Sequence, residues 1–262
     1  MDPVITSLQN PKIKEVVKLR DRRARDESGL FLIEGYRELK RALDAGRAIQ
    51  TLFYCPELFL GSNDGNIKNQ CKAALHCSKD VFAKISYRDR PDGLLAVAPQ
   101  MHLGLADLQL KENPFLLVAE GIEKPGNLGT ILRSCDAAGV DGVVVCDPTT
   151  DIHNPNVVRS SVGTLFTLPV LEASTEETLQ FLKGRGIAIV AATPHAAEEF
   201  TQADFKGPLA IVVGTEQYGL SKTWMDEADI RVRIPMLGVA DSLNVASATT
   251  LLLYEVVRQR RL

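Results

Sequence analysis

The sequence predicts an α/β protein of two domains, the second built on a mostly parallel sheet. Short apolar runs alternate with segments of helical periodicity, which is the pattern of strands joined by helices. A stretch bounded by prolines, Pro99 to Pro114, separates a smaller alternation from a larger one. The net charge also changes there, from +4 over residues 1–98 to −7 over residues 99–262. We therefore expect a small α/β domain at 1–98, a linker at 99–114 and a larger domain at 115–262.

The chain opens on a basic segment, Asn10 to Arg25, with seven cationic and two anionic residues. Ile13, Val16 and Val17 recur at helical spacing, which predicts one helix with an apolar face and cations on its other faces. Such a helix is either a solvated surface or a contact for nucleic-acid phosphates, where released counterions supply the affinity. The candidate phosphate contacts are Lys12, Lys14, Lys18, Arg22, Arg23 and Arg25.

The rest of the first domain shows three strand-like apolar runs and two amphipathic, helix-like segments. A glycine directly after the first helix-like segment, Gly46, marks its end. In chain order we expect a strand at Leu30–Ile33, a helix at Tyr36–Ala45, a strand at Thr51–Cys55, a helix around Ile67–Leu75 and a strand at Leu94–Ala98.

Five strand-like runs separated by helical patterns follow in the second domain. Runs of this kind are typical of a parallel sheet with helices on its faces. Ligands of such sheets bind at the carboxyl ends of the strands, so the residues that follow each run are the candidates for function. The runs are FLLVAEG, GVVVCD, IAIVAATP, LAIVVGTE and IRVRIPM, which begin at Phe115, Gly142, Ile187, Leu209 and Ile230.

The first candidate place is Glu120–Gly139, where a strand passes through a turn rich in Gly and Pro into a helix. Asn127 lies at the helix start, either as an N-cap or as an amide facing a ligand. Arg133 lies off the apolar stripe of the helix, where an arginine is either solvated or available to an anionic ligand.

The second candidate place is Gly214–Ser221, GTEQYGLS, directly after an apolar strand. Its glycine spacing resembles half of a Walker loop, but the phosphate-reaching lysine is absent, which excludes an NTPase of that type. No GxGxxG follows any strand, which argues against a dinucleotide-binding domain. The sequence leaves a glycine turn that approaches a ligand closely and carries one carboxylate, Glu216.

The third candidate place is Ile234–Glu255, where a loop precedes a buried helix. Asp241 or Ser242 is the expected cap of that helix. Ser242 and Asn244 are polar groups at its first turn, so each is either part of the cap or part of a site.

In this order and spacing, the segments PGNLGTILRSCDAAG, VVGTEQYGLS and IPMLGVADSLNVASATTLLLYE resemble the three signature motifs of SpoU-type RNA ribose 2′-O-methyltransferases, the TrmH-like enzymes of the SPOUT superfamily. The first domain resembles, more weakly, the L30e-like RNA substrate-binding domain attached to many of these enzymes, through QNPKIK and LIEGYREL. The resemblance implies a SPOUT α/β domain with a C-terminal trefoil knot. It also implies a homodimer formed through that domain, with the active site shared between subunits.

The resemblance implies transfer of a methyl group from S-adenosylmethionine to a ribose 2′-hydroxyl. Ribosomal RNA, above all 23S rRNA, is expected as the substrate ahead of transfer RNA. Carried over position by position, the catalytic candidates are Arg133, Asn127, Glu216, Ser242 and Asn244, and the positions whose backbone would hold the cofactor are Gly214, Ile234 and Leu243.

Arg133 matches the activating arginine of the family. Because a guanidinium group stays protonated in proteins, we expect it to clamp the neighbouring phosphate and stabilise the developing alkoxide rather than to act as a base. Glu216 is expected to orient Arg133 or Asn127, and Ser242 with Asn244 to position the ribose. The alternative is a non-catalytic RNA-binding or ribosome-assembly protein, which would be expected to lose some of these five side chains; all five are present.

Composition and spacing exclude several other classes. The chain has 262 residues, of which 45% are hydrophobic and 24% charged, and no apolar run reaches the roughly 20 residues of a membrane helix. Its start lacks the apolar core of a secretory signal, so we expect a cytoplasmic protein. Five irregularly spaced cysteines and four scattered histidines predict neither a disulfide framework nor a metal site.

Overall fold

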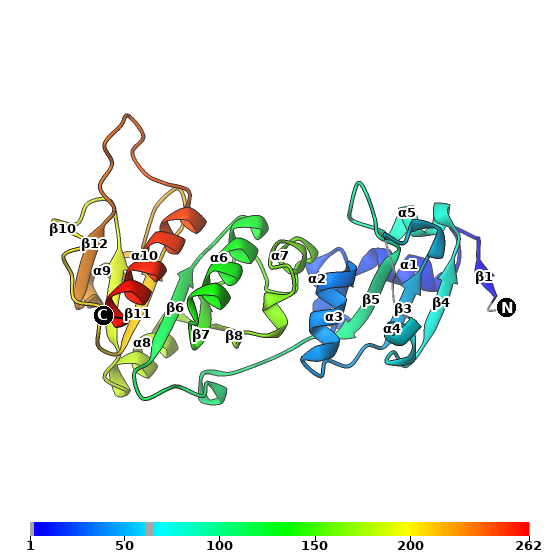
Figure 1. Cartoon of the computed structure of the whole chain (residues 1–262), viewed down its shortest axis with the longest axis horizontal. Helices are drawn as coiled ribbons and strands as arrows, with labels where there is room; N and C mark the ends of the chain where they lie inside the picture. Colours follow the sequence, from blue (N-terminus) through cyan, green and yellow to red (C-terminus); the bar gives the residue numbers. More distant parts are fainter. Residues whose placement is uncertain (1–2, 61–64, 262) are drawn as a thin grey trace. The chain divides into compact units, whose positions relative to one another are not determined.

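The computed structural model describes residues 3–60 and 65–261, which form two compact units. The first unit comprises Met1–Met101 and His153–Thr167, and the second comprises His102–Ile152 and Leu168–Leu262. Each unit consists of a β-sheet with helices packed against it (Figure 1). The predicted α/β class is therefore confirmed.

The first unit is built on a mixed sheet in the order β1-β4-β3-β5-β2. β5 runs antiparallel to β2 and β3, whereas β4 runs parallel to β1 and β3. An apolar core joins α1, β3 and α5 through side chains such as Ile13, Phe53 and Phe82. The elements are β1 Val4–Ile5, α1 Pro11–Lys18, α2 Arg22–Ser28, β2 Leu30–Glu34, α3 Tyr36–Asp44, β3 Thr51–Tyr54, α4 Gly65–Asn69, β4 Ala74–Cys77, α5 Lys79–Ile85 and β5 Leu94–Pro99.

The expected helix at Ile67–Leu75 is wrong beyond its first residues. α4 ends at Asn69, and Ala74–Cys77 is a strand that pairs with both β1 and β3. Such a short strand is stabilised by the partners on its two sides, which a local pattern does not contain. Ser78 follows the strand, and its hydroxyl accepts a hydrogen bond from the Val81 amide, which starts α5.

The basic segment forms two helices, so the prediction of one helix from Asn10 to Arg25 is wrong. The Asn10 side chain caps α1 by accepting a hydrogen bond from the Lys12 amide at 3.0 Å. Asp21 then takes an extended conformation, and α2 begins at Arg22. Arg25 lies in α2, and its side chain, which reaches back to this break, leaves only 1% of the residue's surface exposed. Its Nη1 donates to the carbonyl oxygens of Leu19 and Arg20, at 3.0 and 2.8 Å.

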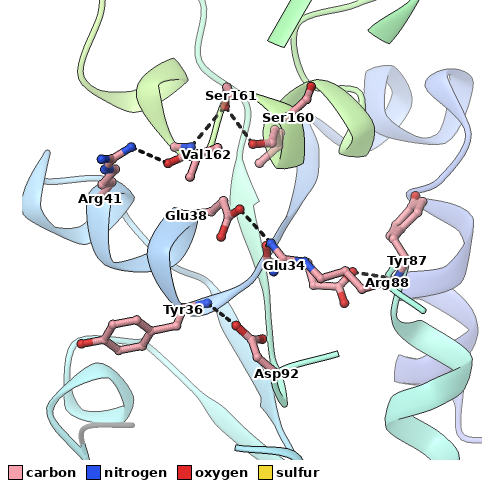
Figure 2. Close-up of polar contacts among 12 residues, drawn as sticks. Glu34, Tyr36, Glu38, Arg41, Tyr87, Arg88, Asp92, Ser160, Ser161 and Val162 are labelled. Atoms are coloured by element: carbon pink, nitrogen blue, oxygen red, sulfur yellow. Dashed lines mark hydrogen bonds and ion pairs between the residues drawn. The ribbon is translucent and has the colours of Figure 1, made fainter. Parts of the chain in front are cut away.

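The segment His153–Thr167 lies in the first unit, although the sequence boundary at 115 groups it with the second domain. It carries α7, Pro155–Ser160, which packs against β2. The Met101 amide donates to His153 Nε2 at 3.0 Å, and the His153 ring lies 4.8 Å from the Phe31 ring. Arg41 Nη1 donates to the Val162 carbonyl oxygen at 2.7 Å (Figure 2). This segment is therefore part of the first unit's packing.

A buried polar cluster, which we call the Glu34 cluster, lies at the carboxyl end of β2 (Figure 2). The Glu34 carboxylate accepts hydrogen bonds from the Ser86 hydroxyl and, at 2.6 Å, from the Tyr87 amide. Arg88 Nη2 lies 2.7 Å from both Glu38 Oε1 and the Glu34 carbonyl oxygen. Burial raises the pKa of Glu34 and of Glu38, and the Arg88 charge opposes this only in part. The cluster fixes the turn from β2 into α3.

The second unit is built on a parallel sheet in the order β10-β12-β9-β11-β6-β7-β8, which confirms the predicted parallel sheet. β8 lies in a region where no strand was predicted. The trefoil knot stays a prediction. The elements are β6 Phe115–Glu120, α6 Pro125–Ala138, β7 Gly142–Cys146, β8 Val170–Ala173, α8 Thr175–Gly184, β9 Ala188–Ala192, β10 Glu198–Glu199, β11 Leu209–Val213, α9 Lys222–Glu227, β12 Ile230–Arg233 and α10 Val245–Arg260.

Residues of the expected linker at 99–114 belong to the packing of the second unit. Leu108 is 5% exposed and lies in the same apolar cluster as Leu116 and Trp224. Leu103 and Leu105 pack against that cluster. Within the described part of the chain, no helix has the length and apolar character needed to cross a membrane.

The order of the parallel strands places a switch point between β6 and β11. β6 leads through α6 to β7 on one side of the sheet, whereas β11 leads through α9 to β12 on the other side. Connections that leave neighbouring strands in opposite directions open a crevice at the carboxyl ends of those strands. The segments that follow β6 and β11 carry the first two candidate places of the sequence.

Candidate active site

Three of the predicted polar residues meet at the switch point through side-chain hydrogen bonds. Asn127 lies in the first turn of α6, Glu216 follows β11, and Asn244 precedes α10. Asn127 Nδ2 donates to Glu216 Oε1, and Asn244 Nδ2 donates to Asn127 Oδ1 at 3.1 Å. The first and third motif segments lie more than 100 residues apart in the sequence. One chain of amide and carboxylate groups nevertheless joins all three segments.

The helix caps decide two alternatives that the sequence left open. The N-cap of α6 is Lys124, followed by Pro125 at the first helical position, so the Asn127 side chain is not needed as a cap. The N-cap of α10 is Asn244, whose Oδ1 accepts hydrogen bonds from the Ala246 and Ser247 amides at 3.0 and 3.4 Å. The prediction that Asp241 or Ser242 caps this helix is wrong, and Ser242 is exposed in the preceding loop.

The loop after β11 turns back on itself over five residues. Thr215 and Gly219 exchange two backbone hydrogen bonds of 3.0 Å each, and Gly219 has a φ of +68°. A Cβ atom on Gly214 would collide with the backbone of Gly219 and Leu220. Position 214 therefore requires glycine, because the backbone of the turn passes directly over it.

The end of this loop is attached to the neighbouring strand. Glu120, the last residue of β6, is 8% exposed, and its Oε2 accepts a hydrogen bond from the Ser221 amide at 2.8 Å. Gly121 follows with a φ of +59°, and a Cβ atom there would lie 3.0 Å from Thr215 Cγ2. The loop is thus held at both of its ends against the end of β6.

A cavity of about 450 Å³ lies beside this loop, within the usual size range of small-molecule sites. The three backbone positions expected to hold the cofactor, Gly214, Ile234 and Leu243, all line it, together with Glu216 and Ser242. Its apolar wall includes Val213, Val232, Val245 and Leu252.

The residues of the cavity fit S-adenosylmethionine. Glu216 Oε2 is buried and has no hydrogen-bond partner among the residues that the structure describes. A buried carboxylate oxygen is costly unless a donor or a cation faces it. The expected cofactor carries both an ammonium and a sulfonium charge, while its adenosyl group suits the apolar wall of the cavity.

Of the predicted catalytic residues, Glu216 and Ser242 line this cavity, and Asn127 and Asn244 are connected to Glu216 by hydrogen bonds. Arg133 neither lines the cavity nor joins these hydrogen bonds. It follows Asn127 by six residues, about 240° around the helix, so the two side chains leave α6 on different sides. Arg133 is exposed and makes no hydrogen bond or ion pair with any residue in 3–60 or 65–261.

The basic candidates lie on the first unit and divide into three kinds. Lys12, Lys14 and Lys18 are exposed on α1. Arg22 and Arg23 are exposed on α2 but face Asp26 and Glu27 in ion pairs of 3.7 and 2.7 Å. The expectation that Arg25 also lies on the exposed basic surface is wrong, because its guanidinium is buried on backbone carbonyl oxygens.

Several cavity residues were not among the sequence candidates. Thr193 and His195 follow β9, and Gln217 and Tyr218 occupy the tip of the turn after β11. Their only sequence signal is their position at the end of an apolar run, which many loop residues share. The described residues contain no group of His, Cys, Asp and Glu side chains arranged to hold a metal ion.

Comparison with known proteins identifies both parts of the chain. Residues 114–254 match the model of the SpoU rRNA methylase family, and residues 10–96 match that of the MRM3-like substrate-binding domain. A 23S rRNA (uridine(2479)-2′-O)-methyltransferase of Streptomyces viridochromogenes is 31% identical over 250 residues, which cover 92% of this chain and 87% of the relative.

Solved structures agree over nearly the whole length. A crystal structure described as an RNA 2′-O ribose methyltransferase is 43% identical with a TM-score of 0.89, and the match covers 99% of this chain and 100% of that one. An AdoMet-bound rRNA methyltransferase from Sinorhizobium meliloti is 32% identical with a TM-score of 0.89, covering 98% and 97%. With its three motif segments joined by side-chain hydrogen bonds, this chain belongs to the SpoU rRNA methylase family.

Proposed function

We propose that this protein transfers a methyl group from S-adenosylmethionine to a ribose 2′-hydroxyl of 23S ribosomal RNA. The observation that carries the proposal is the hydrogen-bonded chain from Glu216 through Asn127 to Asn244 beside a cavity lined by Gly214, Ile234 and Leu243. The names of the relatives from Streptomyces viridochromogenes and Sinorhizobium meliloti support the reaction, the cofactor and the class of RNA.

The chain's task is to align a weak nucleophile. When bound, the cofactor supplies a methyl group on a positively charged sulfur, and its thioether leaves without needing a proton. The transfer would break a carbon–sulfur bond and form a carbon–oxygen bond, and the ribose hydroxyl would give up its proton to a water molecule. Ser242, which is exposed at the cavity, holds the ribose. Asn127 holds the side chains of Asn244 and Glu216 in position beside that ribose through its two hydrogen bonds.

Arg133 acts from a second copy of the chain in this proposal. It does not line the cavity of its own chain, and it lies on α6, which packs against α10 through the Ser134 and Thr250 hydroxyl groups at 2.7 Å. α10 exposes Leu251 and Tyr254, which are 44% and 48% exposed. A homodimer would cover these apolar side chains and bring Arg133 to the partner's cavity, where its guanidinium clamps a phosphate beside the reacting ribose.

The first unit recruits the RNA. Lys12, Lys14 and Lys18 present three charges on the exposed side of α1, opposite the buried Ile13 and Val16. Phosphate contacts of this kind give affinity without sequence preference, which suits a domain that delivers a structured RNA to a separate catalytic unit.

The test is transfer of labelled methyl from S-adenosylmethionine to separated ribosomal and transfer RNA from cells that lack this protein. We expect label in 23S rRNA alone, and nuclease digestion should locate it on a ribose. Label on a base would contradict the proposed reaction, and label in transfer RNA alone would contradict the proposed substrate. Calorimetry measures cofactor binding separately. A protein that binds the cofactor but labels no RNA has an intact cofactor site and has not been given its substrate.

A further inference from the structure

Tyr218 is a large aromatic side chain with 78% of its surface exposed, at the edge of the cavity. Its backbone is nevertheless fixed. The Tyr218 amide donates to Thr215 Oγ1 at 3.0 Å, inside the turn closed by the two backbone hydrogen bonds between Thr215 and Gly219. The exposure of this ring is therefore set by a closed turn anchored to the sheet.

The position of the ring relates it to the reacting nucleotide. Tyr218 lines the same cavity as Glu216 and Ser242, where the proposed function places the ribose. A nucleotide whose ribose enters such a site leaves the stack of its neighbours, and enzymes that act on displaced nucleotides compensate by stacking the base on an aromatic side chain. The base is attached to the ribose directly, so it must lie at the edge of the cavity.

We propose that Tyr218 is a stacking platform for the base of the nucleotide that is methylated, with the Gln217 amide beside it facing the edge of that base. Gln217 is exposed, lines the cavity and carries both a donor and an acceptor. The inference rests on the proposed function and extends it, because it names the groups that select the base while the other residues handle only ribose, phosphate and cofactor.

Four variants at this position separate stacking from other contributions. Tyr218→Ala and Tyr218→Leu should lower kcat/KM for an unmodified 23S rRNA transcript about tenfold or more, mainly through KM, since stacking on an aromatic ring is worth about tenfold to a hundredfold per base. Tyr218→Phe and Tyr218→Trp should stay within about twofold of the wild type. Leucine is the matched control, because it keeps an apolar surface but has no ring.

Two further measurements exclude a structural role. The Kd for S-adenosylmethionine and the mass in solution should be the same in all four variants. A Leu variant as active as the Phe variant would overturn the proposal, as would a parallel loss of cofactor affinity or of the wild-type mass.

Photocrosslinking keeps this inference distinct from the proposed function. The bound transcript is irradiated, and mass spectrometry identifies the crosslinked residues. A crosslink at Tyr218 supports the platform even if the wild type transfers no methyl group to that transcript. Crosslinks confined to other residues, in a complex shown to be saturated, overturn it.

Discussion

Each unit of the molecule places a cluster of polar side chains at the carboxyl end of a β-strand, but the two clusters differ in what surrounds them. In the first unit, Glu34 and Glu38 are 6% and 5% exposed, and their carboxylates are occupied by groups of the chain (Figure 2). In the second unit, Glu216 lines an open cavity and keeps one oxygen without a partner among the described residues. A polar cluster therefore indicates a ligand site only where a polar group without a partner in the chain faces a cavity.

Two arginines, one from each unit, differ in the same way. Arg88 is mostly buried and holds the Glu38 carboxylate and the Glu34 carbonyl oxygen. Arg133 is exposed and has no partner in the described parts of its own chain. One should therefore matter for stability and the other for activity.

Arg133→Ala should have the largest effect on catalysis. We expect kcat to fall about a hundredfold to a thousandfold, the usual cost of removing a group that stabilises developing charge. The free energy of unfolding should change by less than about 0.5 kcal/mol, because the side chain is exposed. Steady-state kinetics and urea denaturation measure the two quantities. An Arg133→Lys variant that keeps most of the rate would contradict a bidentate clamp.

Hybrid dimers test whether Arg133 acts in the partner's site. A dimer of one Arg133→Ala copy and one Glu216→Gln copy contains one site in which both residues are intact. Coexpression with two affinity tags should therefore restore about half of the wild-type activity. Hybrid dimers no more active than either variant alone would show that the site is not shared.

Arg88→Ala should lower the stability of the protein rather than its catalytic rate. Removing it leaves Glu38 buried without its cation, which typically costs about 3 to 5 kcal/mol of unfolding free energy. The matched control is Lys222→Ala, which breaks the exposed ion pair with Asp226 in α9 and should cost less than about 0.5 kcal/mol. Equal losses in the two variants would remove the distinction drawn between a buried and an exposed pair.

Replacing Lys12, Lys14 and Lys18 together by Ala should weaken RNA binding and leave cofactor binding unchanged. Each lost phosphate contact should lower the slope of log affinity against log salt concentration by about 1. The matched control is Arg22→Ala with Arg23→Ala, which should have a smaller effect because both arginines face carboxylates on α2. Filter binding of a 23S rRNA transcript over a range of salt concentrations measures both.

The smallest expected effect is on the pH dependence of stability, which should have opposite signs in the two units. Burial raises the pKa of Glu34 and Glu38, so the native first unit binds protons more tightly than the unfolded chain. Its stability should fall as the pH rises above the ordinary glutamate value through the raised values. Arg258 lowers the pKa of Glu255 in α10, so that contribution is lost as the pH falls below the ordinary value.

Hydrogen exchange at pH 5 and pH 7 reports on the two units separately. Amides of the first unit should be better protected at pH 5, after correction for the intrinsic exchange rate. Glu34→Gln and Glu38→Gln should reduce that difference, and the same pH response in the variants as in the wild type would contradict its assignment to these carboxyl groups.

The sequence was sufficient to predict most strands of the second unit because their signals are local. Apolar runs long enough to be buried on both faces define β6, β7, β9 and β11, and the glycines and polar residues directly after them define the loops. Asn127, Glu216 and Asn244 could be predicted to face one site, but their hydrogen bonds depend on the order of strands in the sheet.

The first unit was harder to predict because its signals depend on distant partners. The short strand β4 is defined by pairing on both sides, and Arg25 is buried because it completes the backbone break at Leu19 and Arg20. From periodicity alone an arginine is predicted to be exposed, because the groups that bury it are known only from the fold. Neither the composition nor the residue spacing of His153–Thr167 indicates that this segment packs in the first unit.

That returning segment has a consequence for how the protein can be divided. The chain passes between its two units three times, after Met101, after Ile152 and after Thr167. Cleavage after Met101 alone divides the chain into residues 1–101 and 102–262, so the His153–Thr167 segment of the first unit stays covalently attached to the second unit. A gene truncated at the same point would encode a methylase unit that carries Leu165 and Phe166, 1% and 3% exposed in the whole chain, without the surface that buries them. The first unit is thus not a detachable module, although the match to the substrate-binding family ends at residue 96, before the methylase match begins at residue 114.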